Sequence, residues 1–162
     1  MNGDTALYEL LTTLNIPFEY LEHPPAPTTE IAKQYWAGHD AQHCKNLFFR
    51  NYKGDRHYLV ILDCDKHLDI KSLENTLKQG RLSFASEKRL FKYLGVQPGS
   101  VTPFGLINDR EKHVHIYIDA KLKTAERVSF HPCVNTASLI IRQSDFIKFL
   151  DYLGNSYEEL NI

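Results

Sequence analysis

The sequence Phe130-His131-Pro132-Cys133-Val134-Asn135-Thr136-Ala137-Ser138 lies directly before the apolar run Leu139-Ile140-Ile141. The residues on either side are rich in β-branched and aromatic side chains, so we expect strands over 127–130 and 137–141. Between them lie three polar side chains that can bond a ligand, those of His131, Asn135 and Thr136. Pro132 removes one backbone donor and restricts its neighbour. Packing does not require such a cluster, so the segment indicates a functional loop between two strands.

The rest of the chain alternates between short helix patterns and short strand patterns. Apolar residues at helical spacing behind a capping residue predict helices over 5–14, 29–36, 70–78, 87–94 and 145–153. Further strands are expected over 18–21, 44–52, 57–62, 81–84 and 114–118. This order is neither a regular βαβ repeat nor an all-β pattern. We therefore expect one α+β (mixed α/β) domain over residues 1–162, with helices around a curved, largely antiparallel sheet.

Three connecting segments carry their own signals. Lys53-Gly54-Asp55 joins two β-rich runs, which predicts a hairpin. Val96–Asp109 contains glycines and prolines and is expected to be a loop with a short strand. The tail Tyr157–Ile162 is expected to fray.

Composition limits the classes of function. The net charge of -1 gives no global basic field, so any contact with nucleic acid must come from a local patch. No apolar run approaches the ~20 residues that span a bilayer, and the N-terminus has no basic segment of a signal peptide. A cytoplasmic protein without a membrane partner is expected.

Cysteine and histidine usage does not predict a metal or a disulfide framework. The three cysteines are sparse and form no CxxC pair. Among eight histidines, His39 with His43 and His113 with His115 are suitably spaced pairs. Neither pair has a matched third ligand. We expect no metal and no other cofactor.

Two upstream segments can carry chemistry. Lys45-Asn46 opens the run Leu47-Phe48-Phe49, and a lysine at the mouth of a strand can present its charge to a phosphate or an ester carbonyl. A solvated strand end is the alternative. Gly99–Asp109 can bring backbone N–H groups close to an oxyanion, or it can be a plain connecting loop.

Together these motifs resemble the YbaK/prolyl-tRNA-synthetase-associated domain family. The resemblance covers about Thr5 to Leu153 and is carried by 45–49, by 98–109 and by Phe130-His131-Pro132-x-x-Asn135-Thr136-Ala137. Within the family, the longer Pro-Gly-Ser-Val-Thr-Pro loop and the His-Pro segment are similar to the ProXp-ala subgroup, which hydrolyses alanine mischarged on proline tRNA.

This resemblance implies a compact α+β fold with a small pocket. It implies Lys45, Asn46 and His131 as catalytic residues. The substrate-binding residues that we expect are Phe104, Gly105, Leu106, Asn108, Asn135 and Thr136. The implied partner is the acceptor end of tRNA, with prolyl-tRNA synthetase as a second one, and no sequence-specific binding to DNA.

The residues favour direct hydrolysis, because the sequence shows no Ser-His-Asp or Cys-His set. Lys45 would bind the terminal phosphate or the carbonyl, and His131 would orient ribose or water. Two alternatives stay open: a non-catalytic module of the same fold that binds tRNA or the synthetase, and a hydrolase that uses Cys133. Removal of an amino acid other than alanine is a further alternative.

Overall fold

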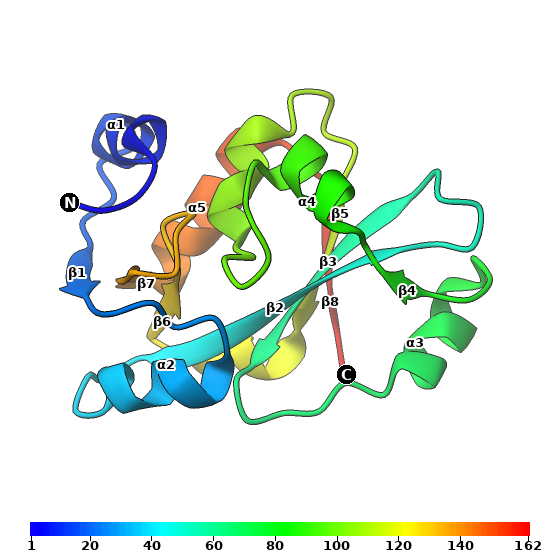
Figure 1. Cartoon of the computed structure of the whole chain (residues 1–162), viewed down its shortest axis with the longest axis horizontal. Coiled ribbons are helices and arrows are strands. Elements are labelled where there is room, and N and C mark those ends of the chain that lie inside the picture. Colours follow the sequence, from blue (N-terminus) through cyan, green and yellow to red (C-terminus); the bar gives the residue numbers. More distant parts are fainter.

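The computed structural model describes residues 1–162 as a mixed α/β fold around one eight-stranded sheet (Figure 1). The strands are β1 (Glu19–Glu22), β2 (Gln42–Arg50), β3 (His57–Asp63), β4 (Ser83–Phe84), β5 (His115–Asp119), β6 (Arg127–Phe130), β7 (Ala137–Arg142) and β8 (Tyr157–Leu160). The helices are α1 (Thr5–Thr13), α2 (Thr29–Trp36), α3 (Ile70–Leu77), α4 (Glu87–Leu94) and α5 (Gln143–Leu153), with 3-10 turns η1 (Pro103–Asn108) and η2 (Ala120–Thr124). The expected fold class is confirmed.

Short polar side chains start four of the five helices. Asp4, Thr28, Asp69 and Ser86 each accept a hydrogen bond from a backbone N–H in the first turn of α1, α2, α3 and α4. α5 differs, because it begins at Gln143 directly after β7 and has no side-chain cap. The sequence predicts Ser144 as the capping residue before a helix at 145–153, and this is wrong, since β7 leads into α5 without a loop.

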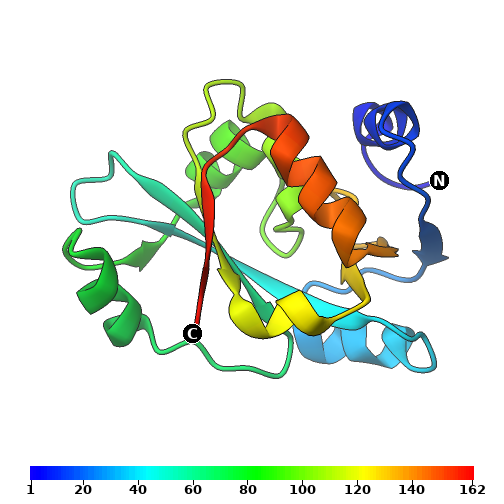
Figure 2. The same ribbon diagram turned by 180° about the vertical axis from the view of Figure 1, so that it is seen from behind.

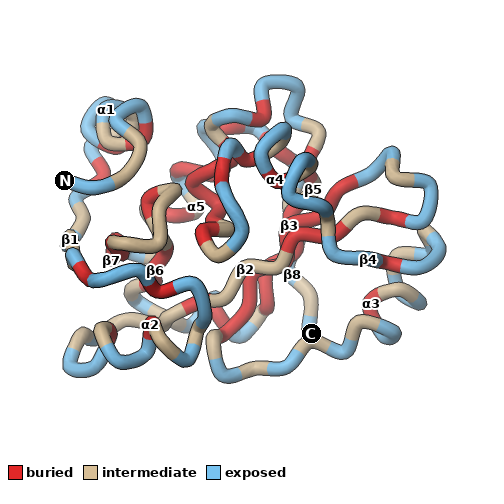
Figure 3. Tube along the Cα trace, viewed as in Figure 1, coloured by how far each residue is buried: buried red, intermediate tan, exposed pale blue.

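The sheet has the strand order β1-β7-β6-β2-β3-β5-β8, and β4 pairs with β2 beside this path. The β2–β3 hairpin is antiparallel, as expected, and pairs seven residues of each strand from Cys44↔Asp63 to Arg50↔His57. The pairs β2–β6, β3–β5 and β5–β8 are parallel, and the other four pairs are antiparallel. All residues of β3 are buried, which makes it the centre of the fold (Figure 3).

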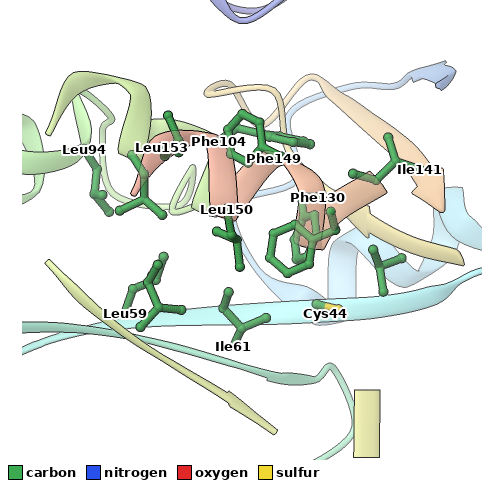
Figure 4. Close-up of a cluster of buried hydrophobic side chains, with 14 of the residues drawn as sticks. Cys44, Leu59, Ile61, Leu94, Phe104, Phe130, Ile141, Phe149, Leu150 and Leu153 are labelled. Atoms are coloured by element: carbon green, nitrogen blue, oxygen red, sulfur yellow. The ribbon is translucent and has the colours of Figure 1, made fainter. Parts of the chain in front are cut away.

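Two apolar clusters cover the two faces of this hairpin. The larger one has 24 buried residues and joins β2 and β3 to α5 and η1. Figure 4 shows Leu59, Ile61 and Cys44 facing Leu150, Phe149 and Phe104 in this core. The smaller cluster joins Phe49, Tyr58 and Val60 to Leu73 of α3. Because side chains alternate along a strand, neighbouring residues of β2 belong to opposite faces.

Two further sequence-based expectations about local structure are wrong. The tail does not fray: β8 pairs in parallel with β5 at the edge of the sheet, where Figure 2 shows the chain end lying along it. Residues 96–109 contain no strand; Pro103–Asn108 form a 3-10 helix that Thr102 caps through Phe104 N–H. The partner that orders the tail is distant in sequence, since β5 lies about 40 residues before β8. No helix is long and apolar enough to cross a membrane.

Candidate active site

A cavity of about 390 Å³ lies beside the middle of β2 and is lined by residues of α2, of the loop before η1 and of the β4–α4 connection. Figure 1 shows where these elements lie in the fold. Its volume lies within the range of small-molecule sites. The residues that line it are Ala26, Pro27, Thr28, Thr29, Ala32, Trp36, Cys44, Lys45, Asn46, Leu47, Phe48, Phe84, Ala85, Leu90, Pro98, Gly99, Val101 and His131. Most are apolar, and few are charged or strongly polar.

The cavity floor is an interrupted edge of the sheet. On the side away from β3, β2 pairs with β6 at Gln42 and His43 and with β4 at Phe49 and Arg50. Between these contacts no strand pairs with this edge. The carbonyl of Phe48 accepts from Ala85 N–H on this side, and alternate residues of a strand direct their peptide groups to the same side. The N–H and C=O groups of Asn46 therefore point away from β3, toward the gap.

Lys45 contributes a free positive charge to this gap. Its side chain lines the cavity and takes part in none of the ion pairs of the structure. The acidic side chains of the neighbouring Asp63–Asp65 segment are bonded elsewhere: Asp65 pairs with Lys33, and Asp63 accepts from Gln42 at 2.7 Å. An ammonium group without a carboxylate partner is available to an anionic or polarised ligand.

Asn46 presents an acceptor that the protein leaves unused. Its Nδ2 donates weakly to the carbonyl of Val101 at 3.4 Å, which fixes which way the amide faces. Its buried Oδ1 has no hydrogen-bond partner. Because a buried acceptor without a partner costs free energy, a ligand donor is the natural partner for this atom.

His131 is held in one tautomer at the end of β6. Its Nδ1 lies 2.7 Å from the carbonyl of Ala137, and since a carbonyl only accepts, Nδ1 carries the proton. Burial is the main cause that lowers the pKa of His131 from its usual 6.5. The ring is therefore neutral at pH 7, and Nε2 has a free lone pair for a water or hydroxyl proton.

A second histidine supports this arrangement from the segment before α2. His23 Nδ1 donates to the carbonyl of Pro24 at 2.9 Å, so its Nε2 accepts from the Ser138 hydroxyl at 3.0 Å. Ser138 Oγ in turn accepts from the Trp36 indole N–H at 3.1 Å. The His23 and His131 rings meet edge to face at 6.0 Å. This network ties α2 to β7 and fixes the wall of the cavity around His131.

Asn135 and Thr136 lie beside the cavity without lining it. Their backbone carbonyls accept from Ala26 N–H at 2.9 Å and His23 N–H at 3.0 Å. These two bonds hold the segment 23–26 along the β6–β7 loop. The structure thus gives both residues a role in positioning a wall through the main chain, and their expected side-chain contact with substrate is not favoured.

The four expected substrate residues of η1 lie outside the cavity. Phe104 and Leu106 are fully buried in the larger core cluster. A Cβ on Gly105 would lie 2.5 Å from the carbonyl oxygen of Leu94, and Asn108 Nδ2 donates to that same oxygen at 3.0 Å. This part of the loop packs against α4, and it is the preceding residues Pro98, Gly99 and Val101 that form the wall.

Cys133 is separate from the cavity and poorly suited to be a nucleophile. It does not line the cavity, and burial raises the pKa of its thiol to about 12. The carboxylates of Asp63 and Asp65, which lie close to the Cys64 sulfur, are bonded to Gln42 and Lys33. A hydrolase mechanism that uses Cys133 therefore has no geometric support.

The sequence-based reasoning did not find several cavity residues. Trp36, Phe84 and Ala32, which line the cavity, have the sequence pattern of ordinary helix and strand residues. His23, which supports the wall without lining the cavity, has the pattern of the start of a stiff connector. Only the pairing of β4 with β2 and the network through Ser138 bring them to the site. No local pattern marks such residues, because their neighbours are distant in sequence.

Comparison with known proteins defines the class. Residues 23–149 match the family model of the aminoacyl-tRNA editing domain. The protein therefore belongs to the aminoacyl-tRNA editing domain family. It is an aminoacyl-tRNA deacylase, an enzyme that hydrolyses the ester between an amino acid and its tRNA. The expected family and enzyme class are confirmed.

The relatives agree with this assignment. The chain is 35% identical over 162 residues to the prolyl-tRNA editing protein ProX of Acetoanaerobium sticklandii, covering 100% of this chain and 99% of that protein. It is 31% identical over 160 residues to prolyl-tRNA synthetase associated domain-containing protein 1 of Bos taurus, covering 96% and 93%. A solved structure described as a candidate trans-editing enzyme for prolyl tRNA synthetase has a TM-score of 0.69, 20% identity and 98% coverage of both chains. At that identity the structural match shows the fold alone.

Proposed function

We propose that this protein is a trans-editing enzyme that hydrolyses alanine from mischarged proline tRNA by direct attack of water. The observation that carries the proposal is that Lys45, Asn46 with its unpartnered Oδ1, and His131 with its unprotonated Nε2 all line one cavity at an open strand edge. The prolyl-tRNA editing protein among the relatives supports the choice of tRNA.

Lys45 supplies the positive charge in this proposal. The ester carbonyl gains negative charge when water attacks, and an ammonium group without another partner stabilises that charge in a partly buried site. Because Lys45 lines the cavity, its ammonium group is also available to bind the phosphate of the terminal nucleotide. The outward-facing N–H of Asn46 is a second donor toward the same developing charge.

His131 and Asn46 Oδ1 position the other groups. The neutral ring accepts a proton through Nε2 from the attacking water or from the terminal ribose hydroxyl. Asn46 Oδ1 accepts from the α-ammonium group of the aminoacyl moiety. Because an aminoacyl ester is already activated, positioning and charge stabilisation suffice without a covalent intermediate.

Selection between amino acids is proposed to depend on local shape. At about 390 Å³ the cavity has room for more than an alanyl group, so total volume does not exclude proline. The lining includes the small residues Ala26, Ala32 and Gly99, and Gly99 packs closely on Pro27, where a Cβ would lie 3.2 Å away. We propose that the part of the lining that meets the aminoacyl group fits alanine closely and penalises the larger proline ring, because overpacking is costly.

The proposed partners follow from the substrate. The acceptor end of proline tRNA enters the cavity, and prolyl-tRNA synthetase, which makes the mischarged product, is the second proposed partner. Both act in translation, so we propose a cytoplasmic location.

The test is to incubate the protein with alanyl-, prolyl- and cysteinyl-tRNA(Pro) and to measure the released amino acid. We expect fast release of alanine and little release of proline. Prolyl-tRNA cleaved as fast as alanyl-tRNA would refute the specificity. Absence of any cleavage would favour a non-catalytic module, and loss of activity on alkylation of Cys133 would favour a thiol mechanism.

A further inference from the structure

An exposed aromatic ring stands at the mouth of the cavity. Phe84 is 61% exposed and lines the cavity. One side of its ring stacks on the fully buried Phe49, with centroids 4.7 Å apart and 27° between planes. The opposite side has no aromatic neighbour in the structure. The ring is therefore supported from behind and open in front.

The backbone fixes the direction of this ring. Phe84 pairs with Phe49 in the β2–β4 ladder, and residues directly opposite each other in antiparallel strands point to the same face. The bond from Ala85 N–H to the carbonyl of Phe48 at 2.9 Å anchors the next residue. Phe84 thus needs little further ordering to serve as a contact surface.

The free ammonium of Lys45 lies on the same face of β2. Side chains alternate between the two faces of a strand, so one face of β2 carries Lys45, Leu47 and Phe49. The opposite face carries Asn46 and Phe48. Phe49 lies four positions after Lys45 in the strand, which is about 13 Å along the backbone. The lysine stem spans about half of that distance. The open edge of β2 therefore has a charge at one end and a stacking surface at the other.

We propose that Phe84 is the stacking platform for the 3′-terminal adenine of the tRNA, with Lys45 on the phosphate side of that nucleotide. This inference rests on the proposed function and names how the substrate's end is held. Proteins that hold single-stranded nucleic acid combine aromatic rings for the bases with positive charge for the backbone. Stacking of this kind needs only the flat face of a base, which an unpaired terminal adenine exposes.

The simpler interpretation is that Phe84 is an ordinary exposed side chain, and a second exposed phenylalanine provides a matched control for it. Phe91 on α4 is 63% exposed, as Phe84 is, but it does not line the cavity. Single exposed aromatic residues are common on protein surfaces. If exposure alone caused an effect on binding, the two phenylalanines would behave alike.

The experiment measures binding of an uncharged acceptor-stem minihelix that carries 2-aminopurine in place of the terminal adenine. With the wild-type protein, stacking on Phe84 should quench the fluorescence. Phe84→Ala and Phe84→Leu should remove the quenching and raise Kd roughly 5- to 150-fold, the range expected for one base–aromatic stack. Phe84→Tyr and Phe91→Ala should retain both properties.

A second arm isolates the base itself. The Phe84→Leu penalty should vanish on a minihelix that lacks the terminal base, and Phe84→Leu keeps an apolar cover over Phe49 so that the fold is preserved. Equal quenching and Kd for wild type and Phe84→Leu, or equal effects of Phe84 and Phe91 variants, would overturn the inference. Because the minihelix carries no amino acid, a protein that quenches normally but cleaves no ester would refute the proposed function and leave this inference intact.

Discussion

His131 is a neutral acceptor because of one hydrogen bond and its burial. Its Nδ1–H donates to the carbonyl of Ala137, which leaves Nε2 as the acceptor. Burial lowers the pKa of the ring from 6.5, so protonation of Nε2, which removes this acceptor, requires a pH below that value. A group with a lowered pKa in the folded state keeps its neutral form as the pH falls through its usual value. His131 therefore gives the site an active acceptor over the whole neutral range.

We predict that kcat/KM for ester hydrolysis has its acid limb below pH 6.5. His131→Ala should lose most of the rate and also this limb, because the titrating group is gone. His67→Ala, which changes an exposed histidine away from the cavity, should leave the profile unchanged. A limb centred above pH 6.5, or one that persists in His131→Ala, would show that another group titrates.

The residues of η1 show where sequence reasoning about a site fails. Only the start of the segment Gly99–Asp109 lines the cavity, and its sequence pattern does not separate Gly99, which lines it, from Gly105, which packs on Leu94. Both glycines read alike in sequence. Their difference arises from the distance to α4, which only the tertiary structure sets. Lys45, Asn46 and His131 are expected at one site from the family resemblance of their segments, and all three line the cavity, although Lys45 and Asn46 lie in the middle of β2 and not at a strand end.

At the level of helices and strands, local signals were reliable and long-range pairing was not. Four caps, the hairpin at Lys53-Gly54-Asp55 and the strands beside the His131 loop were all predictable from neighbouring residues. β8 was not, because its parallel partner β5 lies about 40 residues earlier in the sequence. The short, charged sequence of β8, with two glutamates in four residues, predicts a frayed end when its pairing with β5 is not considered.

We predict that a chain ending at Ser156 is less stable than the full chain. The truncation removes the four residues paired with β5 and the partly buried Leu160 and Ile162, at a cost on the order of 2 kcal/mol. For a chain of this size that is a melting temperature lower by roughly 4–8 °C. Removal of Asn161 and Ile162 alone is the control and should cost less. An unchanged melting temperature for the longer truncation would mean that β8 does not hold the edge of the sheet.

The molecule as a whole has little positive charge with which to bind tRNA. The net charge is -1, and of the basic residues on α4, Arg89 is already bonded to Gly54 and His57. Lys88 and Lys92 stay exposed on this helix. We therefore expect only a few phosphate contacts with tRNA.

We predict weak binding of tRNA with a shallow dependence on salt. Each phosphate contact adds roughly 0.7–0.9 to the slope of log K against log salt, so a few contacts give a slope of about 2–3. An acceptor-stem minihelix should bind nearly as well as full-length tRNA in the same titration. A slope equivalent to more than about six contacts, or equal binding of unrelated duplex DNA, would contradict a footprint limited to the acceptor end.

The central claim is that the cavity at the open edge of β2 cleaves the aminoacyl ester, and Lys45→Ala tests it most directly. The measurement is the single-turnover rate of alanyl-tRNA(Pro) hydrolysis, with melting curves for each variant and with Lys71→Ala, an exposed lysine of α3 away from the cavity, as the control. Because Lys45 has no ion-pair partner in the folded protein, its loss should leave the melting temperature nearly unchanged. The account predicts a rate on the order of 100-fold lower or more for Lys45→Ala and a normal rate for Lys71→Ala. A folded Lys45→Ala protein that hydrolyses the ester at a near-normal rate would contradict it.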